Sequence, residues 1–167
     1  MNRLDPVRRA QVLAALVEGN SIRSTSRMLG IARNTINAYL LEAGAACARY
    51  QDATLRNLKC QRIQCDEIWS FCYAKDKNVP AGMQGQFGVG SVWTWTAIDA
   101  DSKLIVTWMV GGRDGEAAKL FMNDVASRLS NRVQLTSDGH PSYFDAVERA
   151  FGSEVDYAML IKQYTGD

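Results

Sequence analysis

The sequence predicts an α/β protein in which a small all-α domain precedes a domain built on a mixed β-sheet. Over residues 1–45, apolar side chains recur at the three- and four-residue spacing of amphipathic helices. Residues 46–60 lose that periodicity and are expected to form a linker. Residues 61–167 then read as short strands and two helices in the order βββαβαβ. The chain is therefore expected to fold as two domains.

Three helices are predicted in the first domain. They are expected over residues 6–18, 22–29 and 33–41, the last extending at most to residue 47. Asp5 and Ser21 are suitable N-cap residues for the first two helices, since their side-chain oxygens can accept from free backbone N–H groups. Gly30 suits the turn that ends the second helix.

The second and third helices have the layout of a helix-turn-helix module. Thr25 and Ser26 are small where two helices must cross, and Gly30 allows a tight turn. In such a module the third helix enters the major groove of DNA, while arginines on the second helix lie toward phosphates. The candidate DNA-binding residues are Arg23, Arg27, Arg33, Asn34, Thr35 and Asn37. The alternative is a three-helix interaction module with these side chains on a solvated face.

The second domain begins with three strand-like segments. The expected strands span residues 61–74, 92–98, 103–110, 133–136 and 155–161, and the expected helices run from Asp114 to Asn131 and from Pro141 to Gly152. Residues 75–90, with Pro80 and several glycines, are expected to form a loop. Three antiparallel strands followed by two right-handed crossovers are typical of the ribonuclease-H-like fold, in which the fourth strand lies parallel to the first.

Two aspartates stand at informative positions of that order. Asp66 lies in the middle of the first strand, where a buried carboxylate is costly unless it is paired or holds a metal ion, and Asp138 ends the fourth strand. We therefore expect the two to meet and to hold divalent cations through hard oxygen ligands. Glu67, which follows Asp66, is expected to point to the opposite face and not to serve the same site. The alternatives are an ion pair of Asp66 with Arg62 or Arg113, and an Asx turn at Asp138.

Charge and cysteine content restrict the class of protein. Residues 1–60 contain nine Lys or Arg against four Asp or Glu, a net charge of +5, whereas residues 61–167 contain ten against fourteen, a net charge of −4. A basic front half favours contact with nucleic acid. The four cysteines have no metal-binding spacing, and no stretch has the length and apolarity of a membrane span or signal peptide. We therefore expect a cytoplasmic protein without a zinc site.

Several segments of the second domain resemble transposases of the insertion-sequence-one type, which belong to the DDE recombinase group. The matching segments are Cys65–Phe71, Trp95–Asp99, Lys103–Val106, Gly112–Asp114, Thr136–Tyr143 and Tyr157–Tyr164. The resemblance implies that Asp66 and Asp138 are the first two catalytic residues, with Mg²⁺ or Mn²⁺ as cofactor. It also implies a bacterial, nucleoid-associated enzyme that acts on double-stranded DNA, both the transposon ends and the target, and that forms a homo-oligomer when active.

The sequence departs from the family at its C-terminal end. The family carries a third carboxylate, a Glu in a Glu-Arg-x-Asn stretch, on a helix after the fifth strand, and no such stretch follows residue 161 here. The resemblance therefore implies a C-terminally truncated transposase that lacks its final helix. A non-catalytic DNA-binding regulator or relic of the transposase is the alternative function, and a hydrolytic nuclease of the same fold is a third hypothesis.

Other conspicuous side chains have ordinary interpretations beside functional ones. His140 follows the second aspartate and is either structural or near a phosphate, and Arg113 is either a surface charge or a DNA contact. The four tryptophans are expected to be core or sheet residues first and base-stacking residues second.

Overall fold

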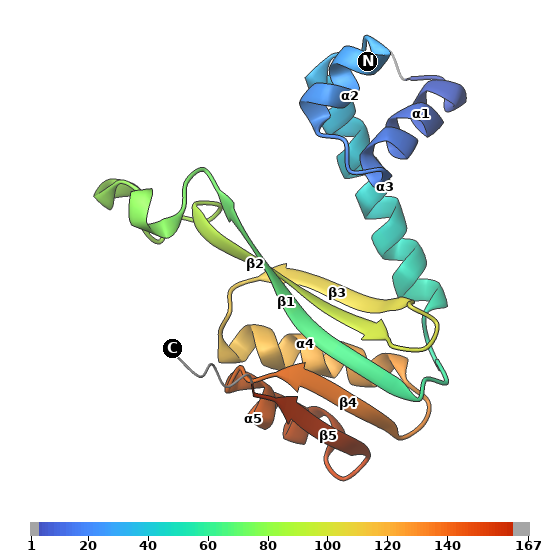
Figure 1. The fold of residues 1–167 in the computed structure, drawn as a ribbon, viewed down its shortest axis with the longest axis vertical. Coiled ribbons are helices and arrows are strands. Elements are labelled where there is room, and N and C mark those ends of the chain that lie inside the picture. Colours follow the sequence, from blue (N-terminus) through green and yellow to red (C-terminus); the bar gives the residue numbers. More distant parts are fainter. Residues whose placement is uncertain (1–3, 162–167) are drawn as a thin grey trace, which may run out of the picture. The chain divides into compact units, whose positions relative to one another are not determined.

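The structure of the protein, a computed structural model, describes residues 4–161 and divides into two compact units with the boundary between Thr54 and Leu55 (Figure 1). The first unit consists of three helices, and the second is a mixed α/β unit built around one sheet. Among the described residues, none of the helices combines the length and the hydropathy that crossing a bilayer requires.

The helices of the first unit are α1 (Pro6–Val17), α2 (Ile22–Leu29) and α3 (Arg33–Thr54). Both predicted N-caps form: Asp5 accepts from the backbone N–H of Arg8 at 2.9 Å, and Ser21 accepts from Ser24 at 3.1 Å. Gly30 ends α2 in the left-handed conformation, with φ of 63°, which glycine adopts without a steric penalty.

A small apolar cluster holds these three helices together. Val12 and Ile36 are fully buried and Ile31 is nearly so. Thr25 of α2 is also fully buried among these helices. The hydroxyl of the next residue, Ser26, donates to the carbonyl of Ile31 at 2.7 Å. Small side chains at these two positions let α2 and the following turn approach each other closely.

The third helix differs from its expected length. Residues 46–54, which were expected to begin an irregular linker, continue α3 as regular helix. The segment is rich in alanine, and alanine stabilises a helix through its intrinsic propensity even where no apolar stripe marks a buried face. Periodicity alone therefore missed at least residues 48–54, about the last third of this helix.

The second unit follows the predicted element order. Its strands are β1 (Arg62–Cys72), β2 (Gly90–Asp99), β3 (Ile105–Gly111), β4 (Val133–Asp138) and β5 (Val155–Leu160), and its helices are α4 (Gly115–Arg128) and α5 (Ser142–Phe151). The sheet order is β3-β2-β1-β4-β5, with β1 antiparallel to β2 and parallel to β4. This is a mixed five-stranded α/β sheet compatible with the ribonuclease-H-like arrangement.

One face of the sheet carries the core. α4 and α5 lie side by side over it (Figure 1) and bury side chains from every strand. The largest fully buried members are Trp95, Tyr143, Phe121, Ile63, Met122 and Leu135. On the other face, Ile68, Trp108 and Val110 remain 44% to 60% exposed, and no helix of residues 55–161 covers them.

The hairpin of β1 and β2 extends beyond the rest of the sheet (Figure 1). Its strands pair without a break from Ile63 opposite Asp99 to Cys72 opposite Gly90. The connection, expected as a plain loop, contains the short 3₁₀ helices η1 (Asp76–Asn78) and η2 (Ala81–Met83). The long β1 matters for the site because it places Asp66 level with the last residue of β4 and Glu67 one residue beyond it.

Candidate metal centre

Three carboxylates converge at the end of the sheet where β4 stops. One oxygen from each of Asp66, Glu67 and Asp138 lies within 4.8 Å of the other two. Asp66 and Glu67 come from the middle of β1, and Asp138 is the last residue of β4. The structure thus brings together the two aspartates that the sequence singled out, and it adds a third acid.

Strand register explains why the aspartates are neighbours. β1 and β4 run parallel with Gln64 opposite Thr136, so Asp66 and Asp138, each two residues further on, occupy equivalent positions on the same face. The Asp66 carboxylate accepts from the backbone N–H of Glu67 at 2.8 Å. The Asp138 carboxylate accepts from the backbone N–H of His140 at 3.0 Å, which is the Asx hydrogen bond considered from the sequence. Both side chains are therefore oriented by backbone donors.

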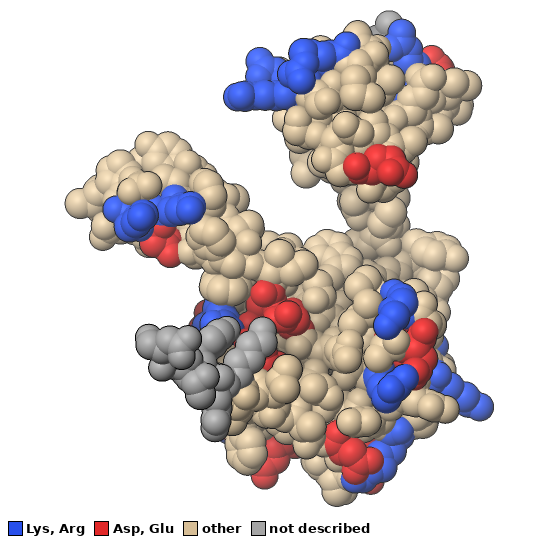
Figure 2. All heavy atoms as spheres, in the orientation of Figure 1, with Lys and Arg blue, Asp and Glu red and all other residues tan. Residues whose placement is uncertain are grey.

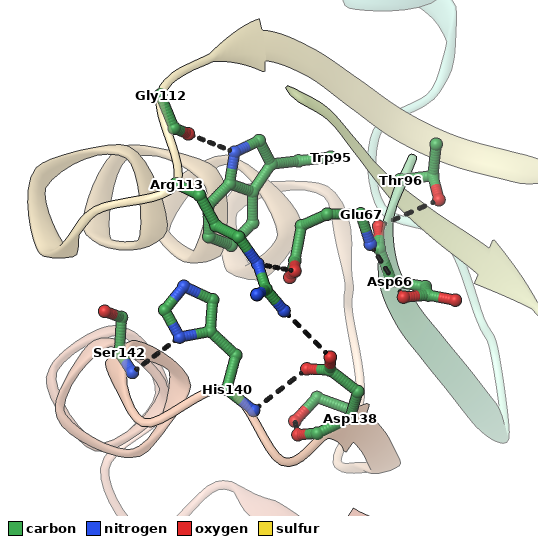
Figure 3. A network of polar contacts seen from close by, with 10 residues as sticks. Asp66, Glu67, Trp95, Thr96, Gly112, Arg113, Asp138, His140 and Ser142 are labelled. Atoms are coloured by element: carbon green, nitrogen blue, oxygen red, sulfur yellow. Dashed lines mark hydrogen bonds and ion pairs between the residues drawn. The ribbon is translucent and has the colours of Figure 1, made fainter. Parts of the chain in front are cut away.

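Glu67 contradicts the expectation that it would stay apart from the site. Its backbone does place it on the face covered by helices, and its side chain is only 1% exposed. The site, however, lies at the end of β4. A side chain from either face of the sheet can reach it there. Glu67 and Asp138 point toward each other there, with the Arg113 guanidinium between them (Figure 3). Alternation along a strand determines the face of the sheet from which a side chain leaves the backbone. It does not determine which site the end of a long side chain reaches.

Arg113 links two of the three acids. Its Nε donates to Glu67 Oε2 at 2.8 Å and its Nη2 donates to Asp138 Oδ2 at 3.1 Å. The guanidinium also lies over the Trp93 ring, 4.7 Å from the ring centroid. The ion-pair alternative for Asp66 is not what forms, because Arg62 pairs with Asp101 and Arg113 pairs with the other two acids.

The inner wall of the cluster is apolar and aromatic. The His140 ring stacks on Trp95 with centroids 6.0 Å apart, and its Nδ1 accepts from the Ser142 backbone, so this histidine has a structural role here. Burial raises the pKa of the Tyr143 hydroxyl, and the Glu67 carboxylate raises it further. Burial likewise raises the pKa of the Cys65 thiol, with added contributions from Glu67 and Asp66. Both groups therefore stay protonated, and the negative charge of the site belongs to the three carboxylates.

The cluster has the properties of a divalent-cation site. Carboxylate oxygens are the ligands that Mg²⁺ and Mn²⁺ prefer. Among the described residues, Glu67 Oε1 is buried and makes no hydrogen bond of normal geometry, although a hydrogen bond with this carboxylate contributes to the raised pKa of Tyr143. The donor set therefore fits a small hard cation.

The direction of β3 predicts that Arg113 lies at the site. β3 pairs antiparallel with β2, which pairs antiparallel with β1, so β3 runs in the same direction as β1 and β4. A residue just after β3 therefore lies at the edge where β4 ends. Arg113, two residues beyond Gly111, meets that condition.

The candidate DNA-binding residues lie on the first unit. Arg23 and Arg27 are on α2, and the other four begin α3; all are exposed except Thr35, which is half-buried. Figure 2 shows Lys and Arg side chains gathered at one end of this unit.

The tryptophans follow their ordinary interpretation in part. Trp95 is fully buried and donates its ring N–H to the carbonyl of Gly112 at 2.9 Å, which fixes the turn before Arg113. Trp93 packs against the core from the same face. Trp69 and Trp108 are sheet residues with 42% and 44% of their surface exposed.

Comparison with known proteins gives a structural likeness. No protein-family model matches the sequence, and no curated protein matches it. The chain is similar to one described as "Crystal structure of the Mos1 Strand Transfer Complex", with a TM-score of 0.38 and 15% sequence identity. The match covers 96% of this chain and 60% of that chain, so this chain spans about three fifths of the length of the protein it matches.

Proposed function

We propose that the protein is a transposase of a bacterial insertion sequence, which binds DNA through its first unit and cleaves and joins DNA strands at the carboxylate cluster with Mg²⁺ or Mn²⁺. The observation that carries the proposal is the convergence of Asp66 and Asp138 from adjacent parallel strands, with ligand oxygens within 4.8 Å. Each aspartate comes from a segment that resembles the catalytic segments of this transposase family.

The chain's own residues prepare the site before any substrate arrives. Backbone N–H groups of Glu67 and His140 each hold one oxygen of an aspartate, which leaves lone pairs on both carboxylates directed at the site. A divalent cation held there supplies the Lewis acid that polarises a phosphodiester and stabilises the charge on its attacking and leaving oxygens. Arg113 places a positive charge beside this position, where it can also attract a DNA phosphate.

The first unit supplies the second half of the proposal. Arg33, Asn34 and Asn37 are exposed at the start of α3, where a recognition helix presents its base-reading residues. Arg23 and Arg27 lie on α2, the helix that would face the DNA backbone. Joining two ends of a DNA element requires two such units at once, so the active form is proposed to be a homo-oligomer.

Cleavage of a plasmid that carries the genomic DNA flanking this gene on both sides tests the enzymatic proposal. We expect Mg²⁺-dependent conversion of the supercoiled plasmid to nicked and linear forms by the wild-type chain, and a loss of at least 100-fold in Asp66→Ala and Asp138→Ala. Asp156→Asn is the matched control, because Asp156 is an exposed acid at the other end of the sheet, where it pairs with Arg132. Its nicking rate should equal that of the wild type.

Two results would overturn the enzymatic proposal in different ways. Cleavage that persists in Asp138→Ala would remove the carboxylate cluster from the chemistry. Salt-sensitive binding of the flanking DNA without any cleavage by the wild-type chain would instead support the DNA-binding regulator. In that case Arg33→Ala should weaken binding while the acid variants leave it unchanged.

A further inference from the structure

We propose that the β1–β2 hairpin carries a binding site for unpaired DNA nucleotides, formed by Trp69, Phe71 and Lys75, which we call the hairpin platform. This inference rests on the proposed function, because it names the form of DNA that the carboxylate cluster takes. That form is a strand whose bases are unstacked beside the phosphodiester to be cut or joined. The platform shares no residue with the carboxylate cluster or with the candidate DNA-binding residues of the first unit.

The platform lies on the strand that carries two of the acids. Trp69 and Phe71 follow Glu67 at intervals of two residues, so all three side chains leave β1 on the same face. Two residues of a strand span about 7 Å. The core covers this face at Cys65, whereas Trp69 and Phe71, on the projecting part of the hairpin (Figure 1), are 42% and 46% exposed. A DNA strand that passes from the cluster along the hairpin therefore meets the two rings within a few nucleotides.

The spacing of the rings suits a strand with its bases spread apart. The ring centroids of Trp69 and Phe71 are 5.8 Å apart. Bases stacked in duplex DNA repeat about every 3.4 Å along each strand, so two consecutive stacked bases do not match these rings. Lys75 Nζ lies over both rings, 5.4 Å from the Trp69 centroid and 6.0 Å from the Phe71 centroid. The platform thus offers two stacking surfaces for bases and one positive charge for a phosphate between them.

Hydrogen bonds within the hairpin hold the Trp69 ring in place. Its ring N–H donates to the Ser91 hydroxyl oxygen at 3.0 Å. The Asp76 carboxylate in turn accepts from the backbone N–H of Ser91 at 2.7 Å and from the Ser91 hydroxyl. The polar atom of the indole is therefore satisfied inside the protein, and the exposed part of the ring is free to stack on a base.

A second pair of a cation and an aromatic ring connects the platform to the carboxylate cluster. Trp93 of β2 is directly opposite Trp69 of β1, so the two side chains leave the sheet on the same face. The Arg113 guanidinium lies 4.7 Å from the Trp93 centroid and also pairs with Asp138. Aromatic rings and basic groups therefore continue from the cluster to the hairpin. Proteins that bind single strands combine the same two kinds of group.

The lysine favours DNA over a second copy of the chain as the occupant. Residues 68–91 contain Lys75 and Lys77 against Asp76, a net charge of +1 within a domain whose net charge is −4. Figure 2 shows basic side chains on the projecting part of the hairpin. Lys75 is exposed and makes no ion pair with any residue that the structure describes. Lysine is depleted in the centre of interfaces between proteins, whereas a phosphate backbone requires positive charge.

The test is binding of the full-length chain to a short fluorescent oligothymidylate, measured by fluorescence anisotropy in the presence of EDTA. Trp69→Ala and Phe71→Ala should each weaken binding about fivefold or more, because each removes a ring on which a base stacks. Lys75→Gln should weaken binding and reduce the slope of log affinity against log salt by about 0.7, the value for one phosphate contact on a single strand. Trp108→Ala is the matched control, since Trp108 is 44% exposed on the other face of the sheet, and it should bind as the wild type does.

Two results would overturn the inference. The first is a wild-type chain that does not bind oligothymidylate, or wild-type affinity in Phe71→Ala and Lys75→Gln. These two substitutions break no side-chain hydrogen bond that the described hairpin makes, so they remain informative if Trp69→Ala fails to fold. The second is loss of self-association in the same variants, measured by analytical ultracentrifugation, with oligothymidylate binding unchanged, which would assign the platform to a second copy of the chain.

The outcome is separate from that of the plasmid cleavage assay, because binding in EDTA requires no cleavage. Oligothymidylate binding that depends on the platform, in a wild-type chain that does not cleave, would support this inference and contradict the proposed enzyme. Wild-type affinity in the platform variants, in a chain that cleaves with Mg²⁺, would overturn the platform and leave the proposed enzyme intact.

Discussion

Two arginine–carboxylate clusters in the sheet unit share the same chemistry and differ in charge balance. In the first, which we call the α4 cluster, Arg128 Nε donates to Asp124 Oδ2 at 2.8 Å and the Thr107 hydroxyl donates to the same carboxylate. Arg128 also donates to the carbonyl of Leu55 at 3.3 Å. Arg56 also lies close enough to help lower the pKa of Asp124, so positive charge balances the carboxylate of this cluster.

The second, which we call the β1–β4 cluster, consists of Asp66, Glu67, Asp138 and Arg113, and its positive and negative charges do not balance. Arg113 pairs with two acids and a third acid lies beside them, so the cluster has three carboxylates for one paired arginine. A neutral, fully bonded cluster is what a folded chain builds to hold itself together. A cluster with excess negative charge costs folding free energy, and it is retained where a cation binds. Charge balance, more than burial, distinguishes the structural cluster from the proposed functional one.

The largest expected effect on stability belongs to the α4 cluster. Arg128→Met keeps the apolar stem of a side chain that is 6% exposed but removes the guanidinium that pairs with Asp124, which keeps only the Thr107 hydroxyl and the more distant charge of Arg56. We expect the free energy of unfolding, measured by urea denaturation, to fall by about 2–3 kcal/mol, below the full cost of breaking a buried pair because Asp124 is partly exposed. Arg149→Met, which breaks an exposed pair with Asp145 on α5, should leave the free energy of unfolding close to that of the wild type. Equal losses in the two variants would contradict the assignment of Arg128 to a structural cluster.

Removal of the arginine from the β1–β4 cluster should have a different consequence. Arg113→Gln takes a positive charge from beside the proposed cation position, so Mn²⁺ should bind about tenfold more tightly, which corresponds to about 1.4 kcal/mol. The metal-free protein should at the same time lose stability, because Glu67 keeps its charge and loses its counter-ion. Isothermal titration calorimetry measures the first effect and urea denaturation the second. Arg132→Gln, in a pair at the other end of β4, is the control for Mn²⁺ binding.

The opposite sign would be informative. If Mn²⁺ binds more weakly to Arg113→Gln, the guanidinium acts mainly by orienting Asp138, and the electrostatic competition inferred from the charge balance is wrong. Arg113→Lys separates the two effects, since it keeps the charge but cannot donate to Glu67 and Asp138 in a planar fork.

Much of the fold of the sheet unit could be predicted because its signals are local. Alternating apolar residues gave the strands, and the order of elements gave the parallel pairing of β1 with β4. The meeting of Asp66 and Asp138 follows directly from that pairing. The caps at Asp5 and Ser21 were equally local, because an N-cap depends on one side chain and the N–H groups that follow it.

The remaining features depend on properties that a single strand or helix does not encode. Glu67 reaches the site because β4 ends beside it, and where a neighbouring strand ends is a tertiary property. The extent of α3 depends on alanine propensity rather than on burial, so the apolar pattern carried no signal for residues 46–54.

The smallest expected effect concerns the pH dependence of the α4 cluster. Partial burial acts to raise the pKa of Asp124, but hydrogen bonds from Arg128 and Thr107 outweigh it and hold the pKa below the usual value of 3.8. A carboxyl group whose pKa is lowered by folding contributes stability that is complete above its unfolded-state pKa and is lost as the pH falls through the folded-state pKa. The free energy of unfolding should therefore fall between pH 5 and pH 3, and it should fall less in Asp124→Asn, which has no proton to take up. An unchanged pH dependence in this variant would show that Arg128 gains nothing from the charge of Asp124, and the contrast between the two clusters would then rest on hydrogen bonding alone.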